Sequence, residues 1–189
     1  MKGRLVVALL MSAIGLTVVG VAAADKFKGT PGPDVIIGTG GADLIHSLAG
    51  ADTVDGEGGN DRIDAGAGAD RVLGGNGDDH VRGEEGEDNL SGQDGNDVLR
   101  GGPGDDMING GDGNDAIWVG SGQDVQFGGE GNDRLHALAN DNQVDTLDCG
   151  AGHDVAVINR NEPRDVAAGN CEVIRRIVPT PQQAADDDK

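Results

Sequence analysis

Aspartates recur every ninth residue through the middle of the chain, and carboxylate oxygens are ligands that hard cations prefer. Divided into nine-residue units from residue 29 to residue 136, the sequence gives twelve units without an insertion, and the sixth position of each is aspartate. An uninterrupted repeat places equivalent residues in equivalent surroundings. The candidate metal ligands are Asp34, Asp43, Asp52, Asp61, Asp70, Asp79, Asp88, Asp97, Asp106, Asp115, Asp124 and Asp133.

The other positions of the unit predict the secondary structure that holds these aspartates. Glycine fills the fourth position of every unit and the first position of nine units, so positions one to six have the composition of tight turns. Position eight is aliphatic in eleven units, which predicts a strand over positions seven to nine with its middle side chain facing inward. Gln126 takes the inward position of the eleventh unit and suggests a local flip or bulge there.

Two units make one turn of a parallel coil, with the strands of odd and even units on opposite sheets. Six such turns, at roughly 4.8 Å each, give a rod on the order of 30 Å long. The expected fold class is all-β, a parallel β-roll (a two-sheet β-helix solenoid) with a small disulfide-linked C-terminal cap.

This coil would stack carboxylates about 5 Å apart along each edge, where they repel one another unless a cation lies between them. Several Ca²⁺ ions are the expected cofactor, because Ca²⁺ accepts six to eight oxygens in flexible geometry and glycine turns expose carbonyl oxygens. Mg²⁺ requires stricter octahedral geometry and should compete poorly. The alternative is a glycine–aspartate solenoid that binds no metal.

The motif GGxGxDxUx, where U is aliphatic, resembles the RTX, or haemolysin-type, calcium-binding nonapeptide repeat. Residues 74–82 (GGNGDDHVR), 101–109 (GGPGDDMIN) and 128–136 (GGEGNDRLH) match it closely. The resemblance implies a β-roll in which the aspartates and turn carbonyls of successive coils share each calcium ion. Three units depart at position one or two, which implies weaker sites: residues 47–55, 83–91 and 119–127.

The N-terminus has the pattern of a secretory signal peptide over residues 1–24. Lys2 and Arg4 precede a largely apolar run that ends in Ala22, Ala23 and Ala24. Cleavage would leave a short lead, residues 25–28, before the first unit, and an uncleaved membrane anchor is the alternative. A secreted, extracellular protein, with a cell-surface location also open, is the expectation, and no other segment could span a membrane.

Beyond residue 136 the repeat weakens and then ends. Two degenerate units place Asp145 and Asp154 at position six as weaker metal ligands, and the rest of residues 137–178 is expected to form a cap over the last coil. The only cysteines, Cys149 and Cys171, would join this cap to the last unit by a disulfide. A free thiol pair and an intermolecular bridge are the alternatives. Residues 179–189 are expected to be a disordered tail.

The formal net charge of −20, from 34 acidic against 14 basic residues, argues against nucleic acid as a partner. The four histidines are scattered and no serine lies in a G-x-S-x-G turn, so no catalytic residues are assigned and the chain is predicted not to be an enzyme. The expected function is a secreted calcium-binding β-roll that folds on binding calcium and acts as a structural or surface-interaction module. The alternative is an accessory module for an exported enzyme or toxin partner.

Arginines are distributed unevenly between odd and even units. Only Arg71 belongs to an odd unit, whereas the even units contain Arg62, Arg82, Arg100 and Arg134. One interpretation is that these side chains are solvated and keep flat sheets from stacking. The other is an anion-binding face for acidic glycans, teichoic-type polymers or lipid headgroups, so anionic cell-surface polymers are candidate partners.

Overall fold

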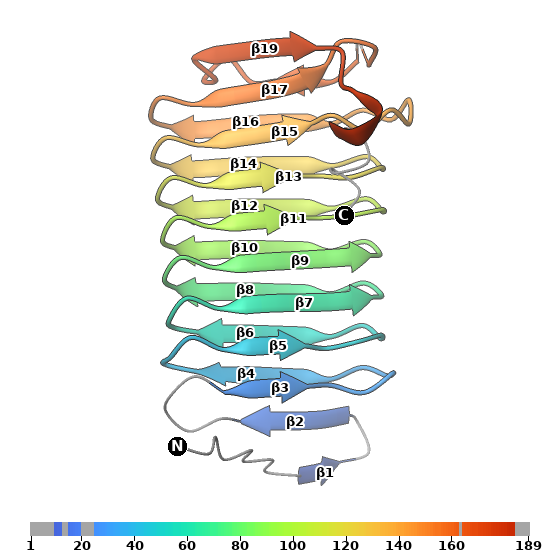
Figure 1. The fold of residues 1–189 in the computed structure, drawn as a ribbon, viewed down its shortest axis with the longest axis vertical. Helices are drawn as coiled ribbons and strands as arrows, with labels where there is room; N and C mark the ends of the chain where they lie inside the picture. Colours follow the sequence, from blue (N-terminus) through green and yellow to red (C-terminus); the bar gives the residue numbers. More distant parts are fainter. Residues whose placement is uncertain (1–9, 13–14, 20–24, 163, 184–189) are drawn as a thin grey trace.

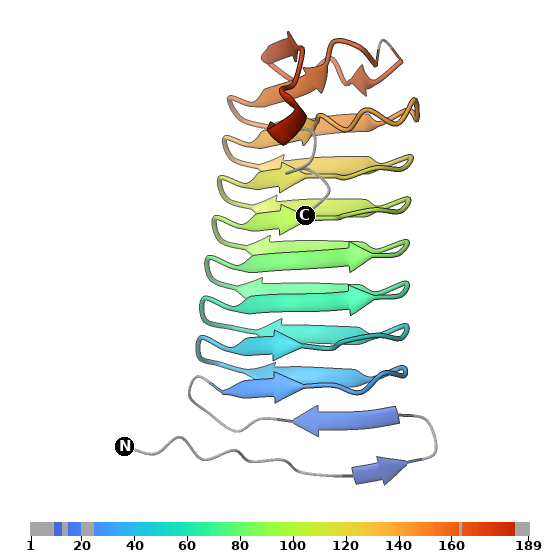
Figure 2. The same cartoon turned by 45° about the vertical axis from the view of Figure 1, so that its right-hand side comes forward.

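The computed structural model describes residues 10–12, 15–19, 25–162 and 164–183. Two sheets face each other and the chain alternates between them, which builds a parallel β-solenoid of about 8 turns (Figure 1). The predicted all-β fold class is confirmed. The turns between the sheets stack into one column at each edge of the solenoid, as both views show (Figure 2).

The strands of the two sheets alternate along the chain. The ten-stranded sheet contains β1 (Leu10–Ser12), β2 (Gly15–Val19), β4 (Val35–Thr39), β6 (Thr53–Glu57), β8 (Arg71–Asn76), β10 (Asn89–Asp94), β12 (Met107–Asp112), β14 (Val125–Glu130), β16 (Thr146–Ala151) and β18 (Val166–Ala167). The nine-stranded sheet contains β3 (Lys26–Lys28), β5 (Leu44–His46), β7 (Arg62–Ala67), β9 (His80–Glu85), β11 (Val98–Arg100), β13 (Ala116–Trp118), β15 (Arg134–Ala137), β17 (Val155–Asn159) and β19 (Val173–Ile177).

The register follows the repeat. Each strand of the nonapeptide region pairs in parallel with the strand eighteen residues away, so that Leu90 lies between Val72 and Ile108. Odd units therefore contribute to the ten-stranded sheet and even units to the nine-stranded sheet, as the repeat predicted. Among the described strands, β1 and β2 form the only antiparallel pair.

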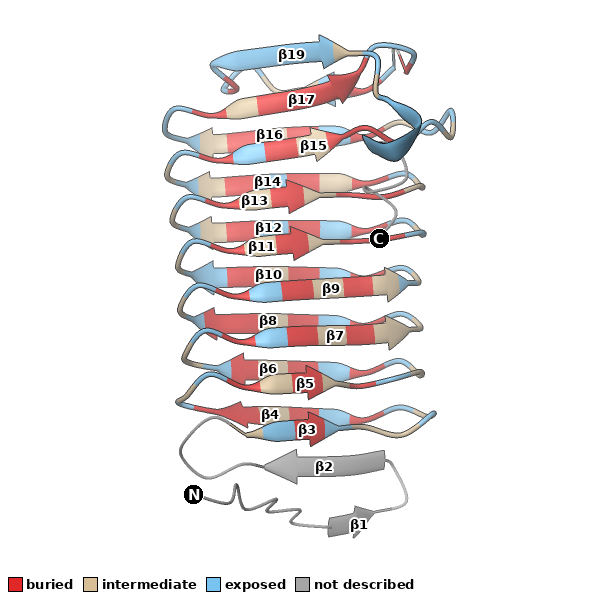
Figure 3. Ribbon diagram, in the orientation of Figure 1, coloured by how far each residue is buried: buried red, intermediate tan, exposed pale blue. Residues whose placement is uncertain are grey.

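The core is a narrow row of apolar side chains between the sheets. Position eight is fully buried from Ile36 to Leu135, while positions seven and nine face outward (Figure 3). Gln126 keeps the inward place in unbroken register between Ile108 and Leu147, so the suggested flip or bulge was wrong. Its amide Nε2 donates to the carbonyl oxygen of His136 at 3.1 Å, which lets a polar side chain remain in the core.

Several strands are longer than the three residues that the repeat predicted. β7, β8, β9, β10, β12 and β14 each contain six residues and continue into positions one to three of the next unit. Position one also faces inward, since Ser47, Ala65 and Val119 at that position are fully buried. Each coil therefore buries residues from positions one and eight, which matters for the sites described below.

The N-terminal lead belongs to the solenoid. Lys26–Lys28 forms β3, with Phe27 buried against the first coil, so residues 26–28 take the places of positions seven to nine in a preceding unit. The expected signal peptide lies largely outside the described residues, and the described segments β1 and β2 fall within it. Its cleavage remains a prediction.

The C-terminal end is closed by β18 and β19, which pair with β16 and β17. A disulfide joins Cys149 of β16 to Cys171, with 5.2 Å between the Cα atoms, and confirms the predicted pairing. Closing a loop of this length contributes about 3 kcal/mol. The last strand has Val173 and Ile174 exposed, and a short helical turn follows at residues 181–183.

Candidate metal-binding sites

The position-six aspartates form two ladders, one in each column of turns. In each ladder the Oδ1 atom accepts a hydrogen bond from the backbone N–H of the aspartate one coil earlier, as Asp79 Oδ1 does from Asp61 at 2.8 Å. The Asp34 edge contains Asp34, Asp52, Asp70, Asp88, Asp106 and Asp124. The Asp43 edge contains Asp43, Asp61, Asp79, Asp97, Asp115 and Asp133.

The second carboxylate oxygen of most of these aspartates is buried and has no hydrogen-bond donor. Desolvating a carboxylate oxygen without a partner is costly, and a bound cation is the usual remedy. The buried Oδ2 atoms without a hydrogen-bond partner belong to Asp52, Asp61, Asp70, Asp79, Asp88, Asp97, Asp106, Asp115, Asp124 and Asp133.

The position-one glycines form one wall of a space lined by oxygens. A Cβ atom built on Gly74 would lie 2.5 Å from Asp79 Oδ2 and 2.8 Å from the carbonyl oxygen of Gly92, one coil further on. Gly38, Gly56 and Gly110 have equivalent neighbours. Each faces the aspartate carboxylate of its own unit and the carbonyl oxygen of the position-one residue in the next coil. A hard cation fits this donor set of carboxylate and carbonyl oxygens.

Burial raises the pKa values of the ten ladder aspartates from Asp52 to Asp133, and neighbouring carboxylates raise most of these values further. The pKa of Asp79 rises to about 6 and that of Asp97 to about 7, in each case chiefly through desolvation. Desolvation is again the main cause in the Asp34 edge, where the pKa of Asp106 rises to about 8 and that of Asp124 to about 9. The N–H donors of the preceding aspartates act in the opposite direction but do not cancel this effect.

The first coil satisfies its carboxylates from within the protein. Thr39 donates its backbone N–H to Asp43 Oδ2 at 2.7 Å, and its hydroxyl lies 3.0 Å from the same atom. Thr30 makes the equivalent contacts with Asp34, at 2.5 and 3.1 Å. Both threonines replace the second glycine of the motif, so the metal ligands predicted at Asp34 and Asp43 differ from the ten that follow.

The two edges differ at position one. All six units of the Asp43 edge have glycine there, whereas three units of the Asp34 edge have Ser47, Ala65 and Val119. These side chains are fully buried, and they occupy the space that faces Asp52, Asp70 and Asp124. The unit of Ala65 was not among those expected to be weak from the sequence. The consequence of its extra methyl group became clear only from the geometry of position one.

The Asp43 edge also has a second ladder, made of amide side chains at position five. Asn114 donates its backbone N–H and its side-chain Nδ2 to Asn96 Oδ1, at 3.0 and 2.8 Å, and Asn132 makes the same contacts with Asn114. Asp78 accepts hydrogen bonds from the backbone N–H and the side-chain Nδ2 of Asn96, and these two hydrogen bonds lower the pKa of Asp78. The sequence analysis missed this ladder, although asparagine recurs eighteen residues apart at Asn96, Asn114 and Asn132.

Both ladders continue into the C-terminal cap. Asp145 and Asp154 accept the N–H groups of Asp124 and Asp133, at 3.1 and 2.8 Å, and the pKa of Asp145 is raised to about 7 by desolvation. Asp165 then accepts from Asp145, and Glu172 from Asp154. Neither residue was identified from the sequence, because neither follows a glycine turn.

Side chains alone do not complete a metal site in the described part of the chain, where no three His, Cys, Asp or Glu side chains converge. A calcium ion between two coils would therefore take most of its oxygens from backbone carbonyls, as Ca²⁺ sites readily do.

A family model described as "RTX calcium-binding nonapeptide repeat (4 copies)" matches residues 19–54, 28–63, 55–90, 91–126 and 127–156. The chain belongs to this family. RTX repeats bind calcium, so this β-roll is a calcium-binding structural module. No match was found among curated proteins. Within the described ranges, no helix is long and apolar enough to cross a membrane.

The arginines of the even units lie on the nine-stranded sheet, as predicted, and Arg71 lies on the other sheet. Arg62, Arg82 and Arg100 line one depression. Arg134 is separate from them and borders a different depression near Asp115 and Asp133. The predicted anion-binding face therefore divides into two areas.

Proposed function

We propose that this RTX protein is exported in an unfolded state and folds outside the cell when calcium fills the spaces between its coils. The observation that carries the proposal is the row of ten buried Oδ2 atoms without hydrogen-bond donors. Without calcium, the folded chain must keep these carboxylates desolvated beside one another. With calcium, the same oxygens become ligands and the binding free energy becomes folding free energy.

The sites are proposed to differ in affinity. Five sites of the Asp43 edge, from Asp61 to Asp133, combine position-one glycine with an unpartnered Oδ2 atom and should bind most tightly. The first coil should bind calcium weakly because Thr30 and Thr39 already donate hydrogen bonds to the Oδ2 atoms of Asp34 and Asp43. Asp145 and Asp154 should also bind weakly, since the residues above them, Asp165 and Glu172, do not follow a glycine turn.

A titration of the full chain by far-UV circular dichroism, starting in chelator, tests calcium-dependent folding. We expect a cooperative coil-to-β transition with calcium at about 10⁻⁴–10⁻³ M, the range of extracellular calcium modules, and none with magnesium at the same concentration. A β-sheet spectrum that is already complete in chelator at pH 8 would refute the proposal, because the turns and the disulfide would then suffice.

Export is proposed from the N-terminal pattern of Lys2 and Arg4, the apolar run and the alanines at residues 22–24. Removal of residues 1–24 would also remove two positive charges and change the formal charge from −20 to −22. Protein recovered outside the cell and beginning at Asp25 would support export, whereas an intact N-terminus in the membrane fraction would indicate an anchor.

A further inference from the structure

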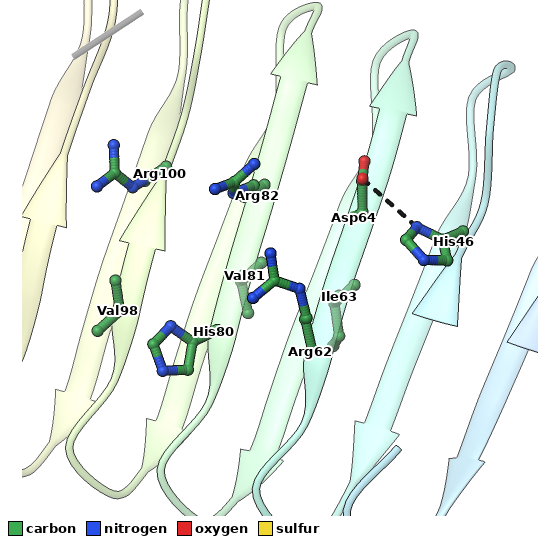
Figure 4. A pocket seen from close by; sticks show the side chains of 9 residues that line it. All are labelled: His46, Arg62, Ile63, Asp64, His80, Val81, Arg82, Val98 and Arg100. Atoms are coloured by element: carbon green, nitrogen blue, oxygen red, sulfur yellow. Dashed lines mark ion pairs between the residues drawn. The ribbon is translucent and has the colours of Figure 1, made fainter. Parts of the chain in front are cut away.

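A shallow depression of about 210 Å³ lies on the outer face of the nine-stranded sheet, over β5, β7, β9 and β11. Figure 4 shows Arg62, Arg82 and Arg100 around it, together with His80. Asp64 is the one acidic side chain that lines it, and it faces away toward His46, whose Nδ1 lies 3.4 Å from its Oδ2 atom. The chemistry of this depression is therefore dominated by guanidinium groups.

The charge of the depression is opposite to that of the molecule. Three arginines and Asp64 line it, and Glu84 lies 3.6 Å from the guanidinium of Arg82, which leaves one positive charge there when the histidines are neutral, in a chain whose formal net charge is −20. Arg82 and Arg100 are direct neighbours in the register of β9 and β11, which sets their backbones about 5 Å apart. Adjacent like charges across strands cost stability, so an anionic ligand between them would relieve an unfavourable contact.

One of these arginines is held in place by its neighbours. The guanidinium carbon of Arg100 lies 4.8 Å from the ring centroid of Trp118, and Trp118 stacks on His136 at 4.9 Å with 18° between the rings. Burial, with Arg134 and Arg100 nearby, lowers the pKa of His136 to about 4 and keeps its ring neutral. A guanidinium fixed in this way loses less conformational entropy when it binds an anion.

We propose that this depression binds a linear acidic polysaccharide through its carboxylate groups. Guanidinium groups pair with carboxylates in two parallel hydrogen bonds, and Arg82 and Arg100 lie at the same register position of adjacent strands, with Arg62 on the next strand at the position that aligns with His80. A flat anionic membrane fits less well, because Glu84 lies 3.6 Å from Arg82 and the exposed Glu85 follows it in β9, so that both carboxylates would meet the same surface. The inference uses the calcium-folded roll as its scaffold and adds a ligand to it.

The test measures binding of the full chain, in saturating calcium, to carboxymethyl dextran by affinity electrophoresis, with neutral dextran of the same length as the reference. We expect the wild-type chain to be retarded only by the charged polymer, and less so as salt is raised. The variant R82Q/R100Q should bind roughly tenfold more weakly, because it loses two charge-assisted contacts. The control R71Q removes an arginine from an outward position of the other sheet, position seven of its unit, and should bind as the wild type does.

Circular dichroism of each variant in calcium separates loss of binding from loss of the roll, and R62Q replaces the double variant if that variant does not fold. The proposal is overturned if the double variant binds the polymer normally, which would indicate bridging by calcium. It is equally overturned if R71Q weakens binding as much as R82Q/R100Q does. Binding to phosphatidylglycerol vesicles with none to carboxymethyl dextran would instead assign the face to a membrane.

Discussion

The Asp34 and Asp43 edges are built from the same nonapeptide, yet they stabilise their turns differently. The Asp43 edge has glycine at position one of all six units and supports its turns with the asparagine ladder. The Asp34 edge fills three of its position-one spaces with Ser47, Ala65 and Val119 and has Pro33, Ala51 and Ala69 where the other edge can have asparagine. The comparison shows that an invariant aspartate can have different surroundings at the two edges.

The difference extends to the protonation of the carboxylates. Near the C-terminal end of the Asp34 edge, the pKa of Asp106 rises to about 8 and that of Asp124 to about 9, chiefly by desolvation. The aspartate between them in the sequence, Asp115 on the Asp43 edge, has a pKa of about 6. Without a metal, this end of the Asp34 edge therefore keeps its protons to higher pH than the Asp43 edge does, whereas the earlier aspartates of the Asp34 edge, at about 6, do not: Asp52, Asp70 and Asp88.

The largest expected effect is that of pH on the metal-free chain. The pKa values of the ladder aspartates from Asp52 to Asp133 lie above the ordinary aspartate value of 3.8, so the metal-free roll holds more protons than the unfolded chain and loses stability as pH rises. Its stability should be complete below about pH 4 and should disappear as pH rises through about 6 to 9. Circular dichroism in chelator should show β structure at acid pH and coil at pH 8.

Calcium should reverse the sign of this dependence. Protons compete with calcium for the carboxylates, so the calcium-loaded chain should become more stable as pH rises from 4 to 7. Two pH profiles of the same slope, with and without calcium, would show that the raised pKa values do not govern folding.

A smaller and more local effect is expected from Gly74→Val on the Asp43 edge. The valine would occupy the space between Asp79 Oδ2 and the carbonyl oxygen of Gly92, where no positive φ restricts the residue type. We expect the calcium stoichiometry from isothermal titration to fall by about one ion. The free energy of unfolding in calcium should fall by about 2 kcal/mol because of overpacking.

Ala65→Val on the Asp34 edge is the matched control. Its position already has a methyl group, and Val119 shows that valine can be buried at the same position three coils later on that edge. This variant should leave the calcium stoichiometry unchanged. An equal loss of calcium in both variants would mean that the two edges bind calcium alike.

The residue types that repeat in phase predicted the fold well. The aspartates at position six and the aliphatic residues at position eight predicted the two ladders, the two sheets and the inward row of side chains, because each of these features depends only on spacing. The pairing of Cys149 with Cys171 also followed from position and number. These features require no knowledge of how a turn is closed.

What could not be predicted depends on contacts between coils. Three contacts are examples, because each depends on where another residue lies in the folded chain. They are the hydrogen bond from the Thr39 hydroxyl to Asp43, the carbonyl oxygen that faces Gly74, and the hydrogen bond from the Gln126 amide to the His136 carbonyl oxygen. Asp165 and Glu172 extend the ladders from irregular segments, where no spacing marks them. A sequence repeat specifies the coil, but it does not specify which side chains and carbonyl groups come into contact within and between coils.

The smallest expected effect is that of Asn114→Ala, which interrupts the asparagine ladder. The variant loses the Nδ2 donor to Asn96 at 2.8 Å and the Oδ1 acceptor of the Asn132 N–H at 3.0 Å, both at an exposed edge. We expect a loss of about 1 kcal/mol. For a chain of this length, that loss lowers the Tm in calcium by about 3 °C. Gln123→Ala is the control, since Gln123 contributes its backbone N–H to Asp105 on the other edge and keeps it in the variant. Equal Tm values for the two variants would show that calcium alone holds the Asp43 edge, and that its amides add nothing to what the glycines provide.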